Sequence, residues 1–173
     1  MKSRRRRASV AGRARSRTAG RAADLTVTLR RCTRRGWVPG AASLRRWATL
    51  ALGRYARGSE LSLLIVGTAR ARTLNRRYRG RDYATNVLSF PAAAQPAGAG
   101  AQLGDIVICP AVLVREARAQ HKLPRAHWTH LFVHGVLHLI GHDHQRAAEA
   151  RRMEQREVRV LRSLGVANPY RSS

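Results

Sequence analysis

The sequence predicts an α+β fold, a small mixed four-stranded sheet flanked by about five helices. Four short segments are apolar or alternate between apolar and polar residues, as strands do. Five longer segments space their apolar residues as helices do. The two kinds of segment follow one another in mixed order, and no internal repeat is visible, which is typical of an α+β arrangement.

The four predicted strands are short and are bounded by turn residues or proline. Residues 25–29 (LTVTL) alternate in polarity, and residues 60–67 (ELSLLIVG) form an apolar run rich in branched side chains. Residues 86–91 (NVLSFP) form a third strand that its proline stops, and residues 103–110 (LGDIVICP) form the fourth. The low-complexity residues 92–102 between the last two strands are expected to form a loop.

The five predicted helices begin or end at residues that suit helix termini. Gly58 is expected to end the first helix, Thr68 to cap the second, and Pro110 to stand in the first turn of the third. The predicted helices cover residues 44–55, 68–78, 111–120, 124–140 and 146–164. The fourth is the most apolar of them.

Basic residues far outnumber acidic residues. The chain has 34 Lys and Arg against 9 Asp and Glu, a formal net charge of +25. Residues 1–23 hold nine of the bases and no acid, and are predicted to be a disordered basic tail. Residues 24–173 still carry +16 and are predicted to form one domain. A domain this basic indicates a polyanionic partner such as nucleic acid, although an arginine-rich proteome would also raise the charge.

Cysteine content and hydropathy bear on the compartment. Cys32 and Cys109 are too few for a disulfide framework and lack metal-ligand spacing, which is typical of a reducing compartment. No apolar run is long enough to span a membrane or to form a secretory signal, so no membrane partner is expected. We expect a cytoplasmic protein, with organelle targeting by the acid-free N-terminus as the alternative.

Residues 134–144 (HGVLHLIGHDH) have the spacing of a metal-binding helix. His134 and His138 are four residues apart, so their imidazoles project from one face of a helix. Gly141 can take a left-handed conformation that ends the helix and lets His144 complete a set of three ligands. Three histidines leave one position of a zinc ion open for water, as in catalytic zinc sites. The alternative is that these histidines only pack on an apolar helix.

A glycine stands where zinc peptidases of the zincin type carry a catalytic glutamate. In those enzymes the glutamate beside the first histidine transfers a proton to the leaving nitrogen. Gly135 cannot do this, which disfavours peptidase activity on this zincin-like helix. A zinc ion can still act on a phosphodiester, because it polarises a phosphoryl oxygen and lowers the pKa of its bound water. The pattern therefore favours phosphodiester chemistry, with a positive side chain to stabilise the transition state.

The remaining histidines and one aspartate have less specific patterns. His130 is expected to orient a ligand or to pack beneath the site, and His121 and His127 to lie at the surface or cap a helix. His142 could contact substrate or be a solvated loop residue. Asp143 could accept a hydrogen bond from a ligating histidine or be a plain turn residue.

Three blocks of the sequence carry a resemblance to a known family. They are residues 74–91 (LNRRYRGRDYATNVLSFP), 103–109 (LGDIVIC) and 127–144 (HWTHLFVHGVLHLIGHDH). In this order they resemble the YbeY family of bacterial endoribonucleases, also called rRNA maturation factors. The resemblance covers about residues 24–170.

The resemblance implies an activity and a set of site residues. Family members cleave single-stranded RNA, mature the 3′ end of the small-subunit rRNA and take part in ribosome quality control. The family's zinc ligands, for one ion per chain, fall on His134, His138 and His144, and its functional arginine falls on Arg79. Asp105 matches an aspartate linked to recognition of a small-subunit ribosomal protein, although from the residues alone it could be an edge-strand charge. The family fold, a small sheet flanked by helices, agrees with the predicted elements.

The leading hypothesis is a bacterial, cytoplasmic, zinc-dependent endoribonuclease. Arg79 and the zinc ligand His134 are its candidate catalytic residues, and the basic surface would hold RNA by its backbone. Two departures from the family pattern, Ala84 for a proline and His142 for a tyrosine, change no predicted ligand. The alternatives are a metal-dependent hydrolase of another class, such as a peptidase, and a non-catalytic rRNA-binding assembly factor with a structural zinc.

Overall fold

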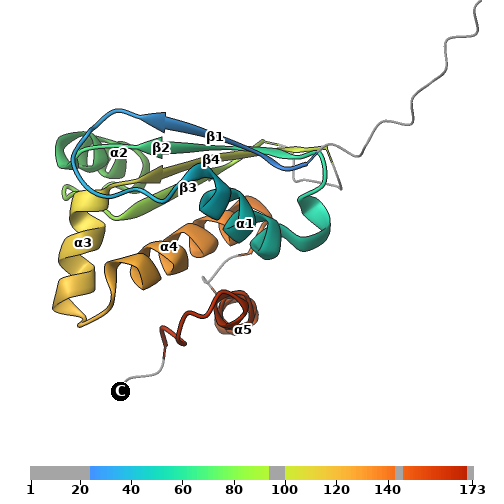
Figure 1. Cartoon of the computed structure of the whole chain (residues 1–173). Helices are drawn as coiled ribbons and strands as arrows, with labels where there is room; N and C mark the ends of the chain where they lie inside the picture. Colours follow the sequence, from blue (N-terminus) through green and yellow to red (C-terminus); the bar gives the residue numbers. More distant parts are fainter. Residues whose placement is uncertain (1–23, 94–99, 143–145, 171–173) are drawn as a thin grey trace, which may run out of the picture.

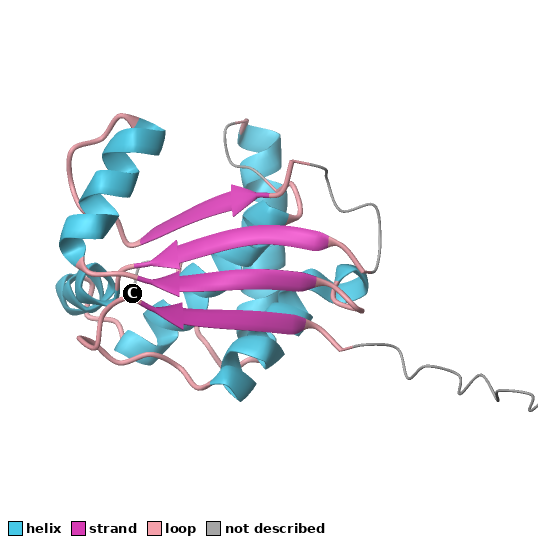
Figure 2. Ribbon diagram, turned by 90° about the horizontal axis from the view of Figure 1, so that it is seen from above, coloured by secondary structure: helices cyan, strands magenta, loops and turns pink. Residues whose placement is uncertain are grey.

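A mixed sheet lies at the centre of the fold. The computed structural model describes residues 24–93, 100–142 and 146–170, and residues 1–23, the predicted basic tail, lie outside this range. The strands of the described part are β1 (Thr26–Arg31), β2 (Glu60–Ile65), β3 (Val87–Pro91) and β4 (Gln102–Ile108), in the order β1-β2-β4-β3. β1, β2 and β4 are parallel, and β3 pairs antiparallel with β4, as its opposed arrow shows in Figure 2.

Helices cover one face of this sheet. Those of the described residues are α1 (Ala41–Leu52), α2 (Thr68–Arg79), α3 (Pro110–Ala119), α4 (Pro124–Leu139) and α5 (Ala147–Ser163), with a short 3₁₀-helix, η1 (Gly53–Tyr55), after α1. α1 and α4 lie on one face with α5 below them, and α2 lies at one end of the sheet (Figure 1), while the opposite face has no helix across it in Figure 2. The predicted α+β fold, with four strands and five α-helices, is confirmed. None of the described helices is both long and apolar enough to cross a membrane.

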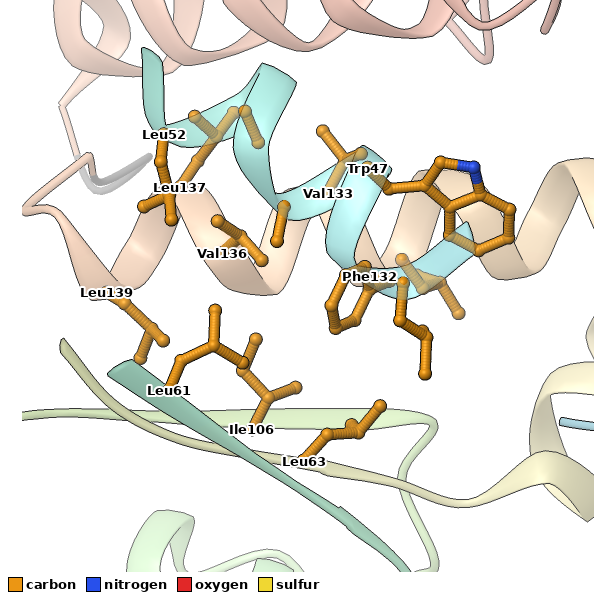
Figure 3. Packing of buried hydrophobic residues seen from close by; sticks show 14 of the residues in the cluster. Trp47, Leu52, Leu61, Leu63, Ile106, Phe132, Val133, Val136, Leu137 and Leu139 are labelled. Atoms are coloured by element: carbon orange, nitrogen blue, oxygen red, sulfur yellow. The ribbon is translucent and has the colours of Figure 1, made fainter. Parts of the chain in front are cut away.

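The main hydrophobic core lies between the sheet and the pair of helices α1 and α4. Leu61 of β2 and Ile106 of β4 face Phe132 and Val136 of α4, and Trp47 of α1 covers Phe132 with a ring separation of 6.3 Å (Figure 3). Burial of each large apolar side chain stabilises the fold by about 1.5–3 kcal/mol. α4 is apolar around most of its circumference because it lies between the sheet and the helices α1 and α5.

A smaller apolar cluster lies on the opposite face of the sheet. Ala71 of α2 and Val112 of α3 pack there against Leu88 of β3 and Val107 of β4. Successive residues of a strand point to opposite faces, so β3 and β4 contribute to both clusters. Opposite surfaces of the same two strands therefore pack against α4 and against the buried residue Ala71 of α2.

Two helix boundaries differ from those that the sequence predicts. The first helix ends at Leu52, not near Gly58, because Gly53 takes a φ of 57° and η1 follows. The apolar spacing continues through η1, which explains why the sequence pattern extends beyond the α-helix. At the second helix Gly67 is the N-cap and Thr68 is already helical, without a side-chain cap. Pro110 stands in the first turn of α3, as predicted.

Candidate metal centre

Helix α4 places four histidines along one side. His127, His130, His134 and His138 are three or four residues apart, which makes them neighbours on the helix surface. The ring centroids of successive histidines lie 6.2, 6.3 and 4.6 Å apart. The shortest separation is that of His134 and His138, the pair that the sequence predicts to bind a metal.

The ring nitrogens of His134 and His138 approach one another closely. Their Nε2 atoms lie 3.1 Å apart, and the planes of the two rings meet at 79°. Two ligands of a tetrahedral zinc ion, each with a Zn–N bond of about 2.0–2.1 Å, would lie about 3.3 Å apart. The separation is that of a hydrogen bond between the two rings and is also compatible with a shared ion, and both side chains remain partly exposed.

Glu157 of α5 determines which nitrogen of His134 is available to a ligand. Oε1 of Glu157 lies 2.8 Å from Nδ1 of His134, and the Glu157 side chain is fully buried. Because an ionised carboxylate only accepts hydrogen bonds, Nδ1 of His134 carries the proton and Nε2 keeps its lone pair. A carboxylate behind the imidazole in this way is the usual support of a metal-binding histidine.

Further side chains stabilise the negative charge of Glu157. The Tyr170 hydroxyl donates a hydrogen bond to Oε2 of Glu157, and Nε2 of His130 lies 3.8 Å from the same oxygen. Burial would raise the pKa of Glu157, but the nearby His130 and the hydrogen bonds from His134 and Tyr170 outweigh it and lower the pKa to about 2. Burial and the adjacent carboxylate also raise the pKa of Tyr170. Glu157 is therefore ionised at neutral pH although it lies in the core.

His130, His134 and Glu157 form a second group that could hold a metal ion. One ligand atom from each of the three lies within 4.8 Å of the ligand atoms of the other two. Among the described residues, this is the group of three side chains that comes this close together. An ion bound there would take Nδ1 of His134, whereas an ion shared with His138 would take Nε2. An ion shared by His134 and His138 leaves in place the hydrogen bonds that Glu157 accepts from His134 and Tyr170. Both arrangements depend on His134.

The chain turns directly after the histidine pair. Gly141 has a φ of 83°, in the left-handed region. Its N–H donates to the carbonyl of His138, and the N–H of His142 donates to the carbonyl of Leu137, both at 3.1 Å. These two hydrogen bonds form a Schellman motif, which closes the C-terminus of a helix. The predicted role of Gly141 in ending the metal-binding helix is confirmed.

The third predicted ligand, His144, lies outside the described residues, and so does Asp143. Of the predicted ligand set the structure thus describes the pair His134 and His138 and the turn that follows it. His142, at the end of that turn, is half-buried. Burial and the neighbouring Arg156 guanidinium lower the pKa of His142.

Gly135, at the position of the peptidase glutamate, is buried against the sheet. A Cβ atom at this position would lie 3.1 Å from Oγ of Ser89 and 3.3 Å from Cγ2 of Ile106. Both separations are shorter than the optimal distance between non-bonded heavy atoms, so glycine lets α4 approach the sheet closely. A glutamate side chain would start against this packed surface. The absence of a carboxylate base from this helix therefore has a packing reason as well as a chemical one.

Arg79 is the last residue of α2, whose buried residue Ala71 packs on the sheet face opposite α4. Its side chain is exposed and, among the described residues, it forms no hydrogen bond or ion pair. The preceding Tyr78 packs edge-on against Phe90 of β3, with ring centroids 4.8 Å apart. The neighbouring Ser89 of β3 faces Gly135 of α4. Strand β3 thus contacts both the helix turn that carries Arg79 and the helix that carries the histidine pair, but no contact among the described residues brings Arg79 itself to that pair.

Asp105 lies on strand β4 with an exposed side chain. It pairs in register with Ser62 of β2 and Phe90 of β3, so β4 is an inner strand. The edge-strand interpretation of Asp105 is therefore wrong. The structure does not bring Asp105 together with the histidine pair, because α4 covers the opposite face of the sheet.

His127 is only 4% exposed, contrary to the expectation of a surface position. Its Nε2 lies 3.2 Å from Oε2 of Glu116, which also accepts a hydrogen bond of 2.8 Å from Nδ2 of Asn86. Burial would raise the pKa of Glu116, but the hydrogen bonds from His127 and Asn86 outweigh it and lower the pKa. The sequence does not show that α3 supplies a carboxylate partner, without which a histidine is costly to bury.

Glu157 and Tyr170 are site residues that the sequence interpretation missed. The buried residues of α5 are Met153, Glu157, Val160 and Leu161, which form one stripe along the helix. A single acidic residue in an otherwise apolar stripe is the signal that could have identified Glu157, because a buried carboxylate needs partners. Tyr170, which follows the last helix, has no comparable pattern.

Comparison with known proteins gives consistent matches. A family model described as "Endoribonuclease YbeY" matches residues 41–165. Curated relatives named "Endoribonuclease YbeY" include one from Alkalilimnicola ehrlichii, 51% identical over 141 residues (79% of this chain, 85% of the relative), and one from Bordetella pertussis, 52% identical over 134 residues (73% and 84%). Another, from Stenotrophomonas maltophilia, is 47% identical over 150 residues (84% and 93%). The solution structure of TM1509 from Thermotoga maritima covers 85% of this chain and 100% of its own, with a TM-score of 0.54 and 19% identity, which shows a similar fold.

Proposed function

Because the chain belongs to the Endoribonuclease YbeY family, we propose that it is a metal-dependent endoribonuclease. The observation that carries the proposal is the 3.1 Å approach of Nε2 of His134 to Nε2 of His138, with Glu157 behind His134. Two partly exposed imidazoles, of which His134 is held by a buried carboxylate, suit an ion that remains accessible to substrate.

The proposed metal is zinc, one ion per chain, held by His134, His138 and His144. Imidazole nitrogen is a common zinc ligand, and the separation of the described pair agrees with a tetrahedral ion. When bound, such an ion would polarise the scissile phosphate and lower the pKa of a water or hydroxyl group. An ion at His130, His134 and Glu157 is the alternative position.

The protein's own residues have two proposed roles. His134 presents Nε2 to the ion because Glu157 holds its Nδ1 proton. Arg79 stabilises the negative charge that develops on the phosphoryl group. Its guanidinium carries a permanent charge, is exposed and has no carboxylate partner among the described residues. The contact of Tyr78 with Phe90 holds the last turn of α2, which carries Arg79, against β3.

The proposed substrate is single-stranded RNA, in particular the 3′ end of small-subunit rRNA, with a part in ribosome quality control in the bacterial cytoplasm. The net charge of +25 supports a polyanionic substrate, and the names of the relatives specify RNA. Asp105 is the proposed contact for a protein of the small subunit, because it is exposed on the sheet face opposite α4. Residues 24–173 would act as one domain, preceded by the basic tail.

The test of this function is cleavage of structured rRNA fragments by the purified protein. We expect wild-type protein to cleave single-stranded regions, and His134→Ala and Arg79→Ala to lose this activity. His121→Ala and Arg77→Ala are matched controls, since both side chains are exposed and lie outside the proposed site. Zinc should be found by elemental analysis in wild-type protein and be depleted in His134→Ala.

Equal cleavage by all five proteins would identify the activity as a contaminant. Zinc without any cleavage would favour the non-catalytic assembly factor. Chelator-sensitive digestion of casein would favour the peptidase, against which the packed position of Gly135 argues.

A further inference from the structure

An open groove runs between α1 and α5, on the same side of the sheet as α4. One part is a hollow of about 870 Å³, whose lining includes Arg45 and Arg46 of α1 and Arg57. Asp24 is the acidic residue of this lining, and Leu50 of α1 lies at its border. Apart from Asp24, the charged side chains here are all basic.

A second hollow, of about 500 Å³, shares Leu50 with the first and continues along α5. Its lining includes His142 and the α5 residues Arg152, Arg156 and Arg159. Leu50 lines both hollows, so they adjoin at this residue, and we call the two together the α1–α5 groove. One end of this groove is His142, in the turn that directly follows the histidine pair on α4.

The arginines of the groove carry charges that the protein does not neutralise. Arg45, Arg46, Arg57, Arg152 and Arg159 are exposed, and none of them forms an ion pair with a carboxylate of the described residues. Like charges so close together repel one another, so such a cluster lowers stability unless a polyanion binds there.

Arg156 has a different position from the other arginines of the groove. It is half-buried, and its Nη2 donates hydrogen bonds to the carbonyls of Ala51 (3.0 Å) and Leu52 (3.4 Å), at the end of α1. These bonds join α5 to α1 across 105 residues of sequence. The two walls of the groove are therefore fixed relative to one another before any ligand binds.

We propose that the α1–α5 groove binds the phosphate backbone of single-stranded RNA on its way to or from the metal centre. This inference rests on the proposed endoribonuclease function and specifies where its substrate lies. Arginines spaced along a path suit a flexible chain of phosphates, and Leu50, 41% exposed, offers an apolar surface to bases or ribose between them. A flat lipid surface would not enter a groove between two helices.

The test is the salt dependence of binding to a fluorescent oligouridine, measured by anisotropy. The groove variant is Arg45→Gln/Arg46→Gln/Arg159→Gln. The control is Arg115→Gln/Arg118→Gln/Arg125→Gln, which removes the same charge from exposed positions on α3 and the start of α4. Because each phosphate contact on a single strand contributes about 0.7 to the slope of log K against log salt, the groove variant should lose about 2 from the slope. The control should keep the wild-type slope.

Equal salt-dependence slopes for the two triple variants would contradict RNA binding in the α1–α5 groove. If the groove triple variant does not fold, the single variants Arg46→Gln and Arg118→Gln replace the pair, with an expected slope change of about 0.7 for the first alone. Cleavage separates this proposal from the proposed function. If the wild-type protein cleaves RNA and the groove variant binds and cleaves RNA as the control does, RNA does not bind in the groove. The proposed endoribonuclease function then still stands. If the wild-type protein cleaves no RNA but only the groove variant loses RNA binding, the groove is an RNA-binding site. The proposed endoribonuclease function is then wrong.

Discussion

Nδ1 of His134 lies 2.8 Å from Oε1 of Glu157, a fully buried carboxylate from a different helix. The pair joins the candidate metal-binding helix to α5 and fixes the tautomer of the imidazole. Since Tyr170 donates to the other carboxylate oxygen, Glu157 links the C-terminal segment to the site as well. The orientation of His134 is thus set by residues that the sequence places far from it.

The substitution Glu157→Gln should weaken metal binding by about 10–100-fold, as is usual when the carboxylate behind a metal-binding histidine is changed. Glutamine keeps the shape of the side chain but removes the negative charge that makes His134 a better ligand. The measurement is competition for zinc with a chromophoric chelator. The control is Glu154→Gln, an exposed position on the same helix. Unchanged affinity in a folded Glu157→Gln protein would mean that the carboxylate does not support the metal.

Metal removal should lower the thermal stability of the wild-type protein. A ligand that binds only the folded state stabilises it by mass action, by about 2.7 kcal/mol when its free concentration is 100 times the Kd. Addition of a chelator should therefore lower Tm in wild type and have no further effect on His138→Ala. A chelator effect of the same size in both proteins would show that His138 is not a ligand. In that case the effect should be sought in His130→Ala, which changes the alternative group.

The substitution Gly135→Ala should destabilise the protein by about 1–3 kcal/mol through overpacking. In an exposed helix the same change would stabilise by roughly 1 kcal/mol, so the sign of the effect reports the close approach of α4 to the sheet. Because Oγ of Ser89 is the nearest atom to the added methyl group, Ser89→Ala should recover part of the loss in the double variant. Urea unfolding gives the free energies. A stabilised Gly135→Ala protein would contradict the packing described here.

Much of the fold could be predicted because local patterns and tertiary structure agree. Residues 60–65 are an apolar branched run and form an inner parallel strand, and Pro110 and Gly141 mark the helix ends at which they stand. The helix ends at Gly53 and Gly67 were misplaced because several residues near each boundary satisfy the same rules, and tertiary packing selects among them.

The candidate site could be predicted only where its residues are close in sequence. His134 and His138 stand out because a helix converts a spacing of four into a shared face. Glu157 and the partner of His127 could not be identified in this way, since each contact joins two separate helices. Neither the helix-crossing geometry nor the order β1-β2-β4-β3 is encoded in a local pattern.

Acid should remove the stabilising effect of the Glu116 network. The pKa of Glu116 is lower in the folded protein than its ordinary value. Its contribution to stability is therefore complete above the ordinary glutamate pKa of about 4.3 and is lost as the pH falls through the folded-state value. Wild-type protein should lose more stability than Glu116→Gln between neutral pH and about pH 3, measured by urea unfolding. Glu154→Gln, at an exposed position, should follow wild type. If the free energy of unfolding of wild type and of Glu116→Gln changed equally with pH, the Glu116 network would not be the cause of the acid destabilisation.

The substitution Arg79→Ala should lower kcat on RNA by about 10²-fold or more and leave metal content unchanged, because the charge is needed only when the phosphoryl group becomes more negative. Arg79→Lys should restore part of kcat, since lysine keeps the charge but lacks the planar pair of donors.

Arg77, on the same turn, lies 5.5 Å from the centre of the Tyr78 ring, so Arg77→Ala removes an equal charge from a different position. The contact of Tyr78 with Phe90 fixes the direction of this turn, and Tyr78→Ala should reduce kcat in the same direction as Arg79→Ala. Equal losses for Arg77→Ala and Arg79→Ala would mean that general charge, rather than Arg79 itself, promotes the reaction.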